Sequence, residues 1–227
     1  MTASVVQQMI VTIDGPAGSG KSTAARRLAE RLGFEFLDTG AMYRAVAWRS
    51  LSLGADVDDA QQIAEIAQRM QIDVLGSIVR ADGCDVTAAI RTPEVSGAAS
   101  RVAAIPDVRT AMVRLQRKAA EGRNVVSEGR DQGTVVFPHA ECKFYLTADP
   151  NERARRRRLE LAAQGEEIAF EDLLQQILER DTRDRTRETA PLRAADDALR
   201  IDTSHLSLDE TVERMEAVVR AKTGDAA

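Results

Sequence analysis

The strongest chemical signal in the sequence is a glycine-rich segment near its start. Residues 15–22 read Gly-Pro-Ala-Gly-Ser-Gly-Lys-Ser and match the pattern G-x-x-x-x-G-K-[ST]. The glycines let backbone N–H groups converge on an anion, and the N-terminus of the helix that follows adds its positive dipole. Lys21 is expected to reach the β- and γ-phosphates, and the Ser22 hydroxyl to bind Mg²⁺. The segment therefore predicts a nucleotide-phosphate site rather than a flexible glycine-serine turn.

A second polar segment, residues 38–44, follows the second apolar run of the chain. Thr39 can cap the helix that follows or bind an anion there, and Arg44 adds a bidentate donor one turn inside that helix. An ordinary strand-to-helix turn with a surface arginine is the alternative. The sequence contains no Asn-Lys-x-Asp element to read guanine. That weakens a GTPase switch and leaves ATPases and kinases open.

Five arginines lie within six residues of one predicted helix, at Arg153 and at positions 155–158. This helix is expected to begin with Asp149 as its N-cap and with Pro150 as its first residue. Its arginines Arg153, Arg156 and Arg157 share one helical face, where they repel one another unless an anion joins them. We expect a mobile lid that closes on a transferring phosphoryl group and excludes water. A nucleic-acid patch and a solvated helix face are the alternatives.

A further set of charges has helical spacing near the C-terminal end. Arg180, Asp184 and Arg187 stand at i, i+4 and i+7 and therefore share one face of a helix. The apolar stripe of this helix is expected to be formed by Leu173, Leu174, Ile177 and Leu178. Taken alone, the charged stripe is more often a solvated salt-bridge ladder than a binding site.

The elements that position these residues follow from apolar runs and turn residues. A strand at 9–13, the glycine-rich turn, a helix from 21 that ends at Gly33 and a strand at 34–37 form a βαβ unit. Three later strands are predicted at residues 124–127, 143–147 and 199–202. Together they indicate an α/β fold with a doubly wound, five-stranded parallel sheet.

Residues 55–100 break this alternation. Short antiparallel strands are predicted at residues 71–75, 78–80 and 84–87, with Asp82-Gly83 as the hairpin turn. A helix is expected after them, with Thr92 as N-cap and Pro93 as its first residue. We interpret this stretch as an inserted α+β lobe.

Composition limits the class of protein. The chain has 227 residues, 44% of them hydrophobic, with a formal net charge of −5 and two cysteines. An acidic balance disfavours a dedicated nucleic-acid partner, and two distant cysteines form neither a disulfide framework nor a metal cluster. Apolar runs are too short to span a membrane. We expect a cytoplasmic protein, and a monomer, because no apolar stripe remains after the helices are packed.

Four segments together resemble the bacterial cytidylate kinases, P-loop nucleoside-monophosphate kinases. They occur in the family's order and cover nearly the whole chain. They are Ile-Asp-Gly-Pro-Ala-Gly-Ser-Gly-Lys-Ser-Thr at 13–23, Leu-Asp-Thr-Gly-Ala-Met-Tyr-Arg at 37–44, Glu-Gly-Arg-Asp-x-Gly-Thr at 128–134, and Arg-Asp-x-Arg-Asp-Arg-x-Arg at 180–187, the last followed by Ala-Pro-Leu at 190–192. The resemblance implies transfer of a phosphoryl group from ATP, with Mg²⁺, to CMP or dCMP. A kinase of another small acceptor and a non-catalytic nucleotide switch are the alternatives.

The resemblance also implies a role for each matching residue. The ATP-binding residues would be Gly15, Pro16, Ala17, Gly18, Ser19, Gly20, Lys21, Ser22 and Thr23. The acceptor phosphate would be held by Thr39, Tyr43, Arg44, Arg109 and Arg130. The cytosine edge would be read by Ser100, Asp131 and Arg187, and the ribose bound by Arg180 and Asp184. Glu128 is assigned to the CMP site and stands where the family often has aspartate. The catalytic cations would be Lys21, Arg130, Arg153, Arg156 and Arg157.

Base selection has a simple chemical reason. The Asp131 carboxylate can accept a hydrogen bond from the amino group at C4 of cytosine. Uracil presents a carbonyl at that position, so two acceptors would face each other and the analogue would be rejected. No histidine base is expected, because the acceptor phosphate is already ionised at neutral pH.

We divide the chain into one kinase domain with three parts. The core is expected to comprise residues 1–38, 101–152 and 171–227. The monophosphate-binding lobe with its insert would span residues 39–100, and the short helical lid residues 153–170.

Overall fold

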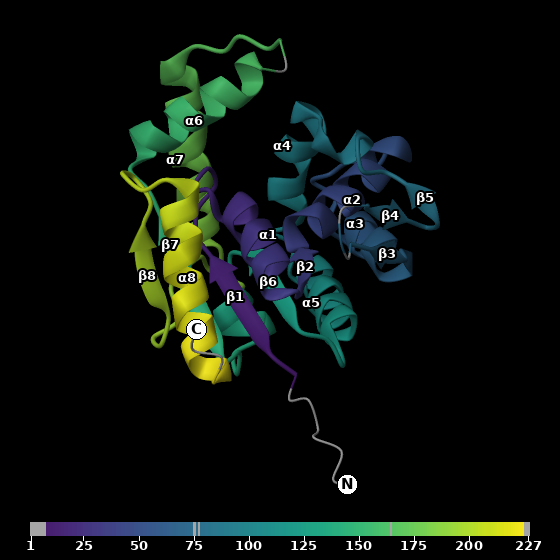
Figure 1. Cartoon of the computed structure of the whole chain (residues 1–227). Helices are drawn as coiled ribbons and strands as arrows, with labels where there is room; N and C mark the ends of the chain where they lie inside the picture. Colours follow the sequence, from purple (N-terminus) through teal and green to yellow (C-terminus); the bar gives the residue numbers. More distant parts are fainter. Residues whose placement is uncertain (1–7, 75, 77, 164, 225–227) are drawn as a thin grey trace, which may run out of the picture.

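A computed structural model describes residues 8–74, 76, 78–163 and 165–224. Its centre is a five-stranded sheet in which all neighbouring strands are parallel, in the order β2-β6-β1-β7-β8 (Figure 1). The strands are β1 (Ile10–Asp14), β2 (Glu35–Asp38), β6 (Val125–Gly129), β7 (Cys142–Thr147) and β8 (Leu199–Asp202). The predicted α/β fold and all five predicted strands are confirmed, with bounds that differ by at most two residues.

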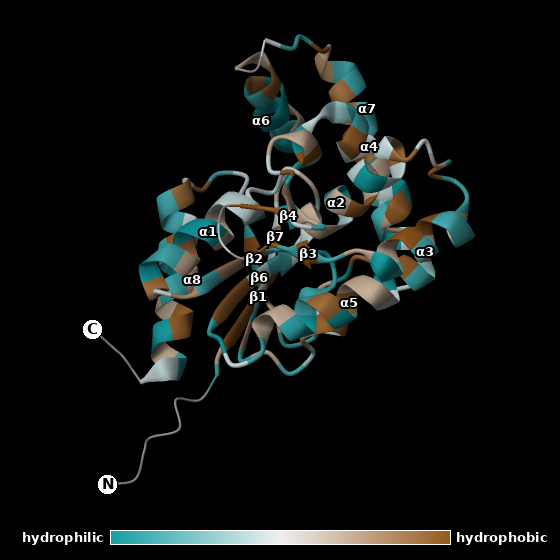
Figure 2. Cartoon of the chain, turned by 90° about the vertical axis from the view of Figure 1, so that its right-hand side faces the viewer, coloured by the Kyte–Doolittle hydropathy of each residue, from teal (hydrophilic) through white to brown (hydrophobic). Residues whose placement is uncertain are grey.

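Helices cover both faces of this sheet, so its strands are apolar on both sides. On one face, α1 (Lys21–Leu32) and α8 (Leu208–Thr223) pack over Val11, Ile13 and Phe144. On the other face, α2 (Thr39–Ser52) and α5 (Pro106–Ala120) pack over Leu37 and Val125. Figure 2 shows the brown, hydrophobic strands between these two helical layers.

The predicted insert forms a small lobe beside α2. It contains α3 (Ala60–Arg69), β3 (Ile72–Asp73), β4 (Arg80–Ala81), β5 (Cys84–Asp85), a short 3-10 turn η1 (Ala89–Arg91) and α4 (Pro93–Val102). Its three strands are antiparallel, as predicted, but only two residues long. Both residues of the hairpin turn, Asp82 and Gly83, have positive φ, as a tight hairpin requires. Leu75, in the first predicted strand, lies outside the described residues.

Two helices carry the arginine-rich segments. They are α6 (Pro150–Ala162) and α7 (Phe170–Thr186), which pack against each other beyond the carboxyl ends of the strands (Figure 1). In the predicted stripe of α7, Leu173 and Ile177 are buried, but Leu178 is 42% exposed. Its assignment to the packed stripe was wrong, because successive residues of an α-helix are turned by about 100°, which carries Leu178 out of the face that buries Ile177. The limits of the lobe and the lid stay predictions.

Most predicted helix caps are confirmed. Asp149 accepts from the N–H of Asn151, and Thr92 accepts from the N–H of Val95 at the start of α4. Thr39 is not the cap of α2. Asp38 occupies that position and accepts a hydrogen bond of 2.8 Å from the Ala41 N–H, since its carboxylate stands one residue earlier on the strand end.

Candidate active site

The glycine-rich loop joins the end of β1 to the start of α1, as the motif requires. A Cβ on Gly15 would lie 2.0 Å from the backbone oxygen of Leu146 on β7, so no side chain fits there. Gly20 has φ +82° and directly precedes the first residue of α1, a conformation that favours glycine. The loop therefore presents the N-terminus of α1 at the carboxyl edge of the sheet, where an anion would meet its dipole.

Lys21 is a buried cation at the foot of this loop, with 5% of its surface exposed. Its Nζ donates a hydrogen bond of 3.2 Å to the Pro16 carbonyl and lies 3.8 Å from Glu128 Oε2. Burial, followed by repulsion from Arg130, lowers the pKa of Lys21 to about 7. A phosphate placed beside Lys21 would add negative charge to that of Glu128 and would favour the protonated ammonium group.

Ser22 and Glu128 place two oxygen groups side by side at the same point. The Ser22 hydroxyl donates a hydrogen bond of 3.0 Å to Glu128 Oε1. Carboxylate and hydroxyl oxygens are the ligands that Mg²⁺ takes in proteins, so these two residues fit that ion. The Glu128 side chain therefore faces the ATP loop, while its backbone oxygen accepts a 2.6 Å hydrogen bond from Thr39 Oγ1. The predicted contact of Glu128 with CMP stays a prediction.

The residues predicted to bind the acceptor come from five separate segments. Thr39, Tyr43 and Arg44 lie on α2, Ser100 on α4, Arg109 on α5, Arg130 and Asp131 after β6, and Arg180, Asp184 and Arg187 on or just after α7.

Two ion pairs join four of these residues. Arg130 Nε donates to Asp184 Oδ2 over 2.9 Å, which connects the end of β6 to α7. Arg109 donates to the Asp131 carboxylate, and its guanidinium carbon lies 5.6 Å from the centre of the Tyr43 ring. The Arg187 guanidinium donates to the Ala190 carbonyl over 2.7 Å. Residues distant in the sequence thus form one polar cluster beside the phosphate loop.

Several buried atoms of this cluster lack a hydrogen-bond partner within the described part of the chain. They are Arg44 Nε, Ser100 Oγ, Arg109 Nε, Arg180 Nε and Arg187 Nη2. An unsatisfied buried polar group destabilises a folded protein by about 1–3 kcal/mol. Five such groups in one cluster therefore lower the stability of the unliganded chain. A polar, anionic ligand would satisfy such donors.

The pKa shifts in the cluster also favour an anionic ligand. Burial lowers the pKa of Arg180 to about 10, and the nearby Arg130 guanidinium adds to that effect. The pKa of Asp184 is lowered: burial opposes ionisation, but Arg130 and Arg180 outweigh it. The site is therefore short of negative charge and suits a phosphate.

The arginines of α6 are not the unpaired cluster that the sequence predicted. Arg153 is 2% exposed, and its guanidinium makes two hydrogen bonds to Asp181, of 3.1 and 2.6 Å. It also donates to the carbonyl of Ala17 in the phosphate loop over 3.1 Å. Arg153 is therefore not an unpaired cation, because it lies in the α6–α7 contact and Asp181 neutralises it.

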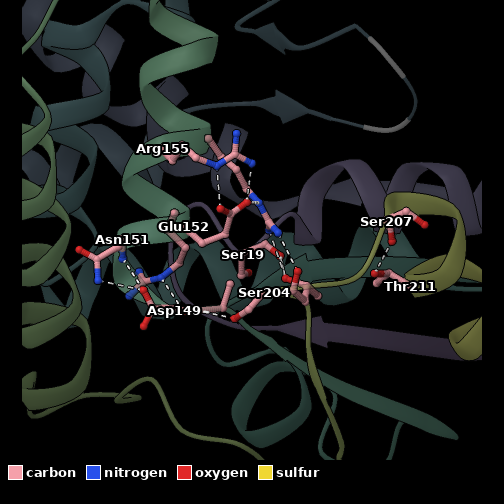
Figure 3. A network of polar contacts seen from close by, with 12 residues as sticks. Ser19, Asp149, Asn151, Glu152, Arg155, Ser204, Ser207 and Thr211 are labelled. Carbon is pink, nitrogen blue, oxygen red and sulfur yellow. Dashed lines mark hydrogen bonds and ion pairs between the residues drawn. The ribbon is translucent and has the colours of Figure 1, made fainter.

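Three further arginines of α6 also have acidic partners. Glu152 accepts hydrogen bonds from Arg155 and Arg156, and Arg157 pairs with Glu160 over 3.1 Å. Figure 3 shows Glu152 beside Arg155, with Ser19 of the phosphate loop close by. Arg156 also donates to the backbone oxygen of Thr203 over 2.6 Å. Helical spacing of three or four residues could have predicted the Glu152 and Glu160 pairs.

Sequence comparison decides the family. The model of the cytidylate kinase family matches residues 11–221. The chain belongs to the cytidylate kinase family. It is therefore an ATP-dependent phosphotransferase, and the P-loop assignment agrees with this class of enzyme.

Curated relatives cover nearly the whole chain. A cytidylate kinase of Caldanaerobacter subterraneus is 47% identical over 213 residues, which cover 94% of this chain and 95% of the relative. A cytidylate kinase of Geobacillus kaustophilus is 47% identical over 222 residues, 96% of this chain and 99% of the relative. A solved structure of an uncharacterized protein from Eubacterium ventriosum is similar, with a TM-score of 0.52 and 13% identity. The match covers 94% of this chain and 99% of that one, and it shows a shared fold.

No helix among the described residues is long and apolar enough to cross a membrane.

Proposed function

We propose that the chain transfers the γ-phosphoryl group of ATP to CMP or dCMP, giving ADP and CDP or dCDP. Membership in the cytidylate kinase family and relatives named cytidylate kinases support this reaction. The observation that carries the proposal is the cationic cluster beside the phosphate loop, in which five predicted CMP-binding residues have buried polar atoms with no partner among the described residues.

On the donor side, the loop would hold the phosphates of ATP with its backbone N–H groups and with Lys21. Ser22 and Glu128 would hold Mg²⁺, which neutralises phosphate charge when it is bound. The hydrogen bond between Ser22 and Glu128 supports this assignment. We therefore assign the Glu128 side chain to the ion rather than to CMP.

On the acceptor side, the proposed roles follow the segments that position each residue. The phosphate of CMP would be held by Thr39, Tyr43, Arg44, Arg109 and Arg130. Ser100, Asp131 and Arg187 would read the cytosine edge, and Arg180 and Asp184 would bind the ribose. An ion pair with Arg109 holds the Asp131 side chain in this cluster, and carboxylate oxygens are the acceptors that the cytosine amino group requires.

Catalysis would consist of positioning and charge neutralisation. The attacking oxygen belongs to an ionised phosphate, so no side chain has to remove a proton. Lys21, Arg130, Arg156 and Arg157 would offset the charge of the transferred group. Arg153 would act through the phosphate loop, since it donates to Ala17 and is paired with Asp181. Mg²⁺ dependence, a monomeric state and a cytoplasmic location stay predictions.

The test is an assay of ADP release with CMP, dCMP, UMP, AMP and shikimate as acceptors. ADP release is expected to depend on CMP or dCMP and to be weak with the other three compounds. Equal consumption of ATP with and without CMP would refute the proposal, and a preference for shikimate would show a kinase of another small acceptor.

A further inference from the structure

The strand that leads into the phosphate loop ends on a buried carboxylate. Asp14, the last residue of β1, is 3% exposed. Its Oδ1 accepts from the backbone N–H of Gln132 and its Oδ2 from that of Gly133, both over 2.8 Å. Burying a carboxylate is costly, and two charge-assisted hydrogen bonds offset part of that cost. Asp14 thus fastens β1 to the turn that follows β6.

This turn carries two residues of the proposed acceptor site. Arg130 and Asp131 directly precede the two N–H groups that Asp14 holds. Their side chains point to other partners, Arg130 to Asp184 and Asp131 to Arg109. The backbone of the turn therefore faces β1, while its charged side chains face the acceptor cluster.

Side-chain hydrogen bonds of Gln132 also hold this turn. The Gln132 amide accepts from Ser127 Oγ over 2.7 Å and donates to Gln116 Oε1 over 3.2 Å, and all three residues are buried. A Cβ on Gly133 would lie 3.0 Å from Thr12 Oγ1, so the turn lies directly against β1. Small displacements of this turn are therefore resisted on several sides.

We propose that Asp14 is a positioning residue that determines acceptor specificity, because its carboxylate fixes the turn at residues 131–133 and thereby fixes the Asp131 carboxylate where cytosine is read. This inference rests on the proposed function. Asp14 also directly precedes Gly15, so a single strand end sets the position of the base-reading carboxylate relative to the ATP loop.

The test is Asp14→Asn, which keeps the size of the side chain. Its amide oxygen can accept one N–H, but its NH₂ group then faces the second N–H, donor against donor. The KM for CMP is expected to rise by about tenfold, which corresponds to one lost buried hydrogen bond. The ratio of kcat/KM for CMP to that for UMP is expected to fall by a similar factor, while the KM for ATP stays within about twofold. An unchanged CMP-to-UMP ratio would overturn the inference.

Arg117→Gln is the matched control. Arg117 holds the other end of η2 (Gln132–Val136), one π-helical turn, by donating to the carbonyls of Val135 and Val136 over 2.9 Å each. Loosening that end is expected to lower the melting temperature without changing the CMP-to-UMP ratio. If both variants lowered the ratio equally, general loosening of η2 would explain the effect and the inference would fail.

A second variant keeps the inference testable if Asp14→Asn does not fold. Gln132→Met keeps the backbone N–H that Asp14 holds but removes the amide that contacts Ser127 and Gln116. The CMP-to-UMP ratio is expected to fall in the same direction by a smaller factor. A ratio equal to that of the unsubstituted enzyme would count against a role for this turn.

Asp131→Asn separates this inference from the proposed function. If Asp131→Asn keeps the preference for CMP, the proposed role of Asp131 itself fails. If it loses the preference but Asp14→Asn keeps it, only the inference fails. Because Asp14 acts through Asp131, the double variant is expected to lose no more preference than Asp131→Asn alone, and losses that multiply would overturn the inference.

Discussion

At the scale of single residues, the site contains buried cationic side chains whose charge is not fully balanced by neighbouring carboxylates. Lys21 has a pKa lowered to about 7 and Arg180 a pKa lowered to about 10, both chiefly by burial. Such groups are unfavourable for folding and favourable for binding an anion. Their common position beside the phosphate loop is what links the electrostatics to the proposed transfer.

Replacing Lys21 by alanine removes the cation nearest to the phosphate loop. Turnover is expected to fall by about a thousandfold, because the charge of the transferred group loses its closest neutralising partner. Steady-state ADP release measures this, and a circular dichroism spectrum checks that the fold is kept. Lys118→Ala, on the exposed side of α5, is the control, and turnover near that of the control would contradict the assignment of Lys21.

The Glu128 carboxylate gives a separate prediction for Mg²⁺. Glu128→Gln is expected to raise the Mg²⁺ concentration needed for half-maximal turnover by about tenfold, as loss of a group that holds or orients a metal does. Asp184→Asn, a change in the proposed ribose site, is expected to leave that concentration unchanged. The same Mg²⁺ requirement in both variants would argue against a metal role for Glu128.

The carboxyl group of Asp14 predicts a pH dependence of stability. Burial raises its pKa to about 7, although hydrogen bonds from the Gly133 and Gln132 N–H groups oppose that rise. The folded chain therefore binds more protons than the unfolded chain between about pH 4 and 7. The free energy of unfolding, relative to that of Asp14→Asn, is therefore expected to fall as the pH rises, by up to about 1.4 kcal/mol per pH unit. Urea unfolding of both proteins from pH 4.5 to 7.5 measures it. A constant difference would contradict the raised pKa.

At the scale of elements, the contact between α6 and α7 depends on a buried ion pair. The Arg153 and Asp181 side chains are 2% and 5% exposed, and Arg153 also contacts the phosphate loop through Ala17. This pair joins the helix that follows β7 to the helix that carries Arg180 and Asp184. The two proposed nucleotide sites therefore share one structural support.

Breaking that pair on one side leaves an uncompensated buried charge. Arg153→Met is expected to lower the free energy of unfolding by about 3 kcal/mol, and Asp181→Leu by a similar amount. The double variant is expected to recover most of the loss, because it buries no charge at all. Urea unfolding measures this, with Arg155→Ala in the exposed Glu152 pair as a near-neutral control. Additive losses in the double variant would show that the two residues do not act as a pair.

At the scale of the whole molecule, the sequence predicts what depends on local patterns. Apolar runs and turn residues located all five strands of the sheet, and the glycine-rich motif located the phosphate loop, because short-range rules govern both. The sequence offered Thr39 as a possible cap of α2, but Asp38 is the cap. Both residue types are good caps, and the choice between them depends on the exact residue at which β2 ends.

Contacts between distant segments could not be predicted in the same way. Arg153 and Asp181 are 28 positions apart, and Asp14 and Gln132 are 118 apart. No sequence periodicity relates such residues. The position of an arginine on a predicted helix therefore does not reveal whether it pairs with a buried carboxylate of another segment. The acceptor-site residues also lie on distant segments, so their prediction depended on the family resemblance and not on sequence spacing.

The most direct test of the central claim is a crystal structure of the chain with bound CMP. The cytosine base is expected within hydrogen-bond distance of Asp131 and the phosphate beside Arg44 and Arg130, facing the loop that contains Lys21. Failure to bind CMP, or CMP bound away from Lys21 and Asp131, would contradict the claim that two nucleotides meet in this cationic cluster.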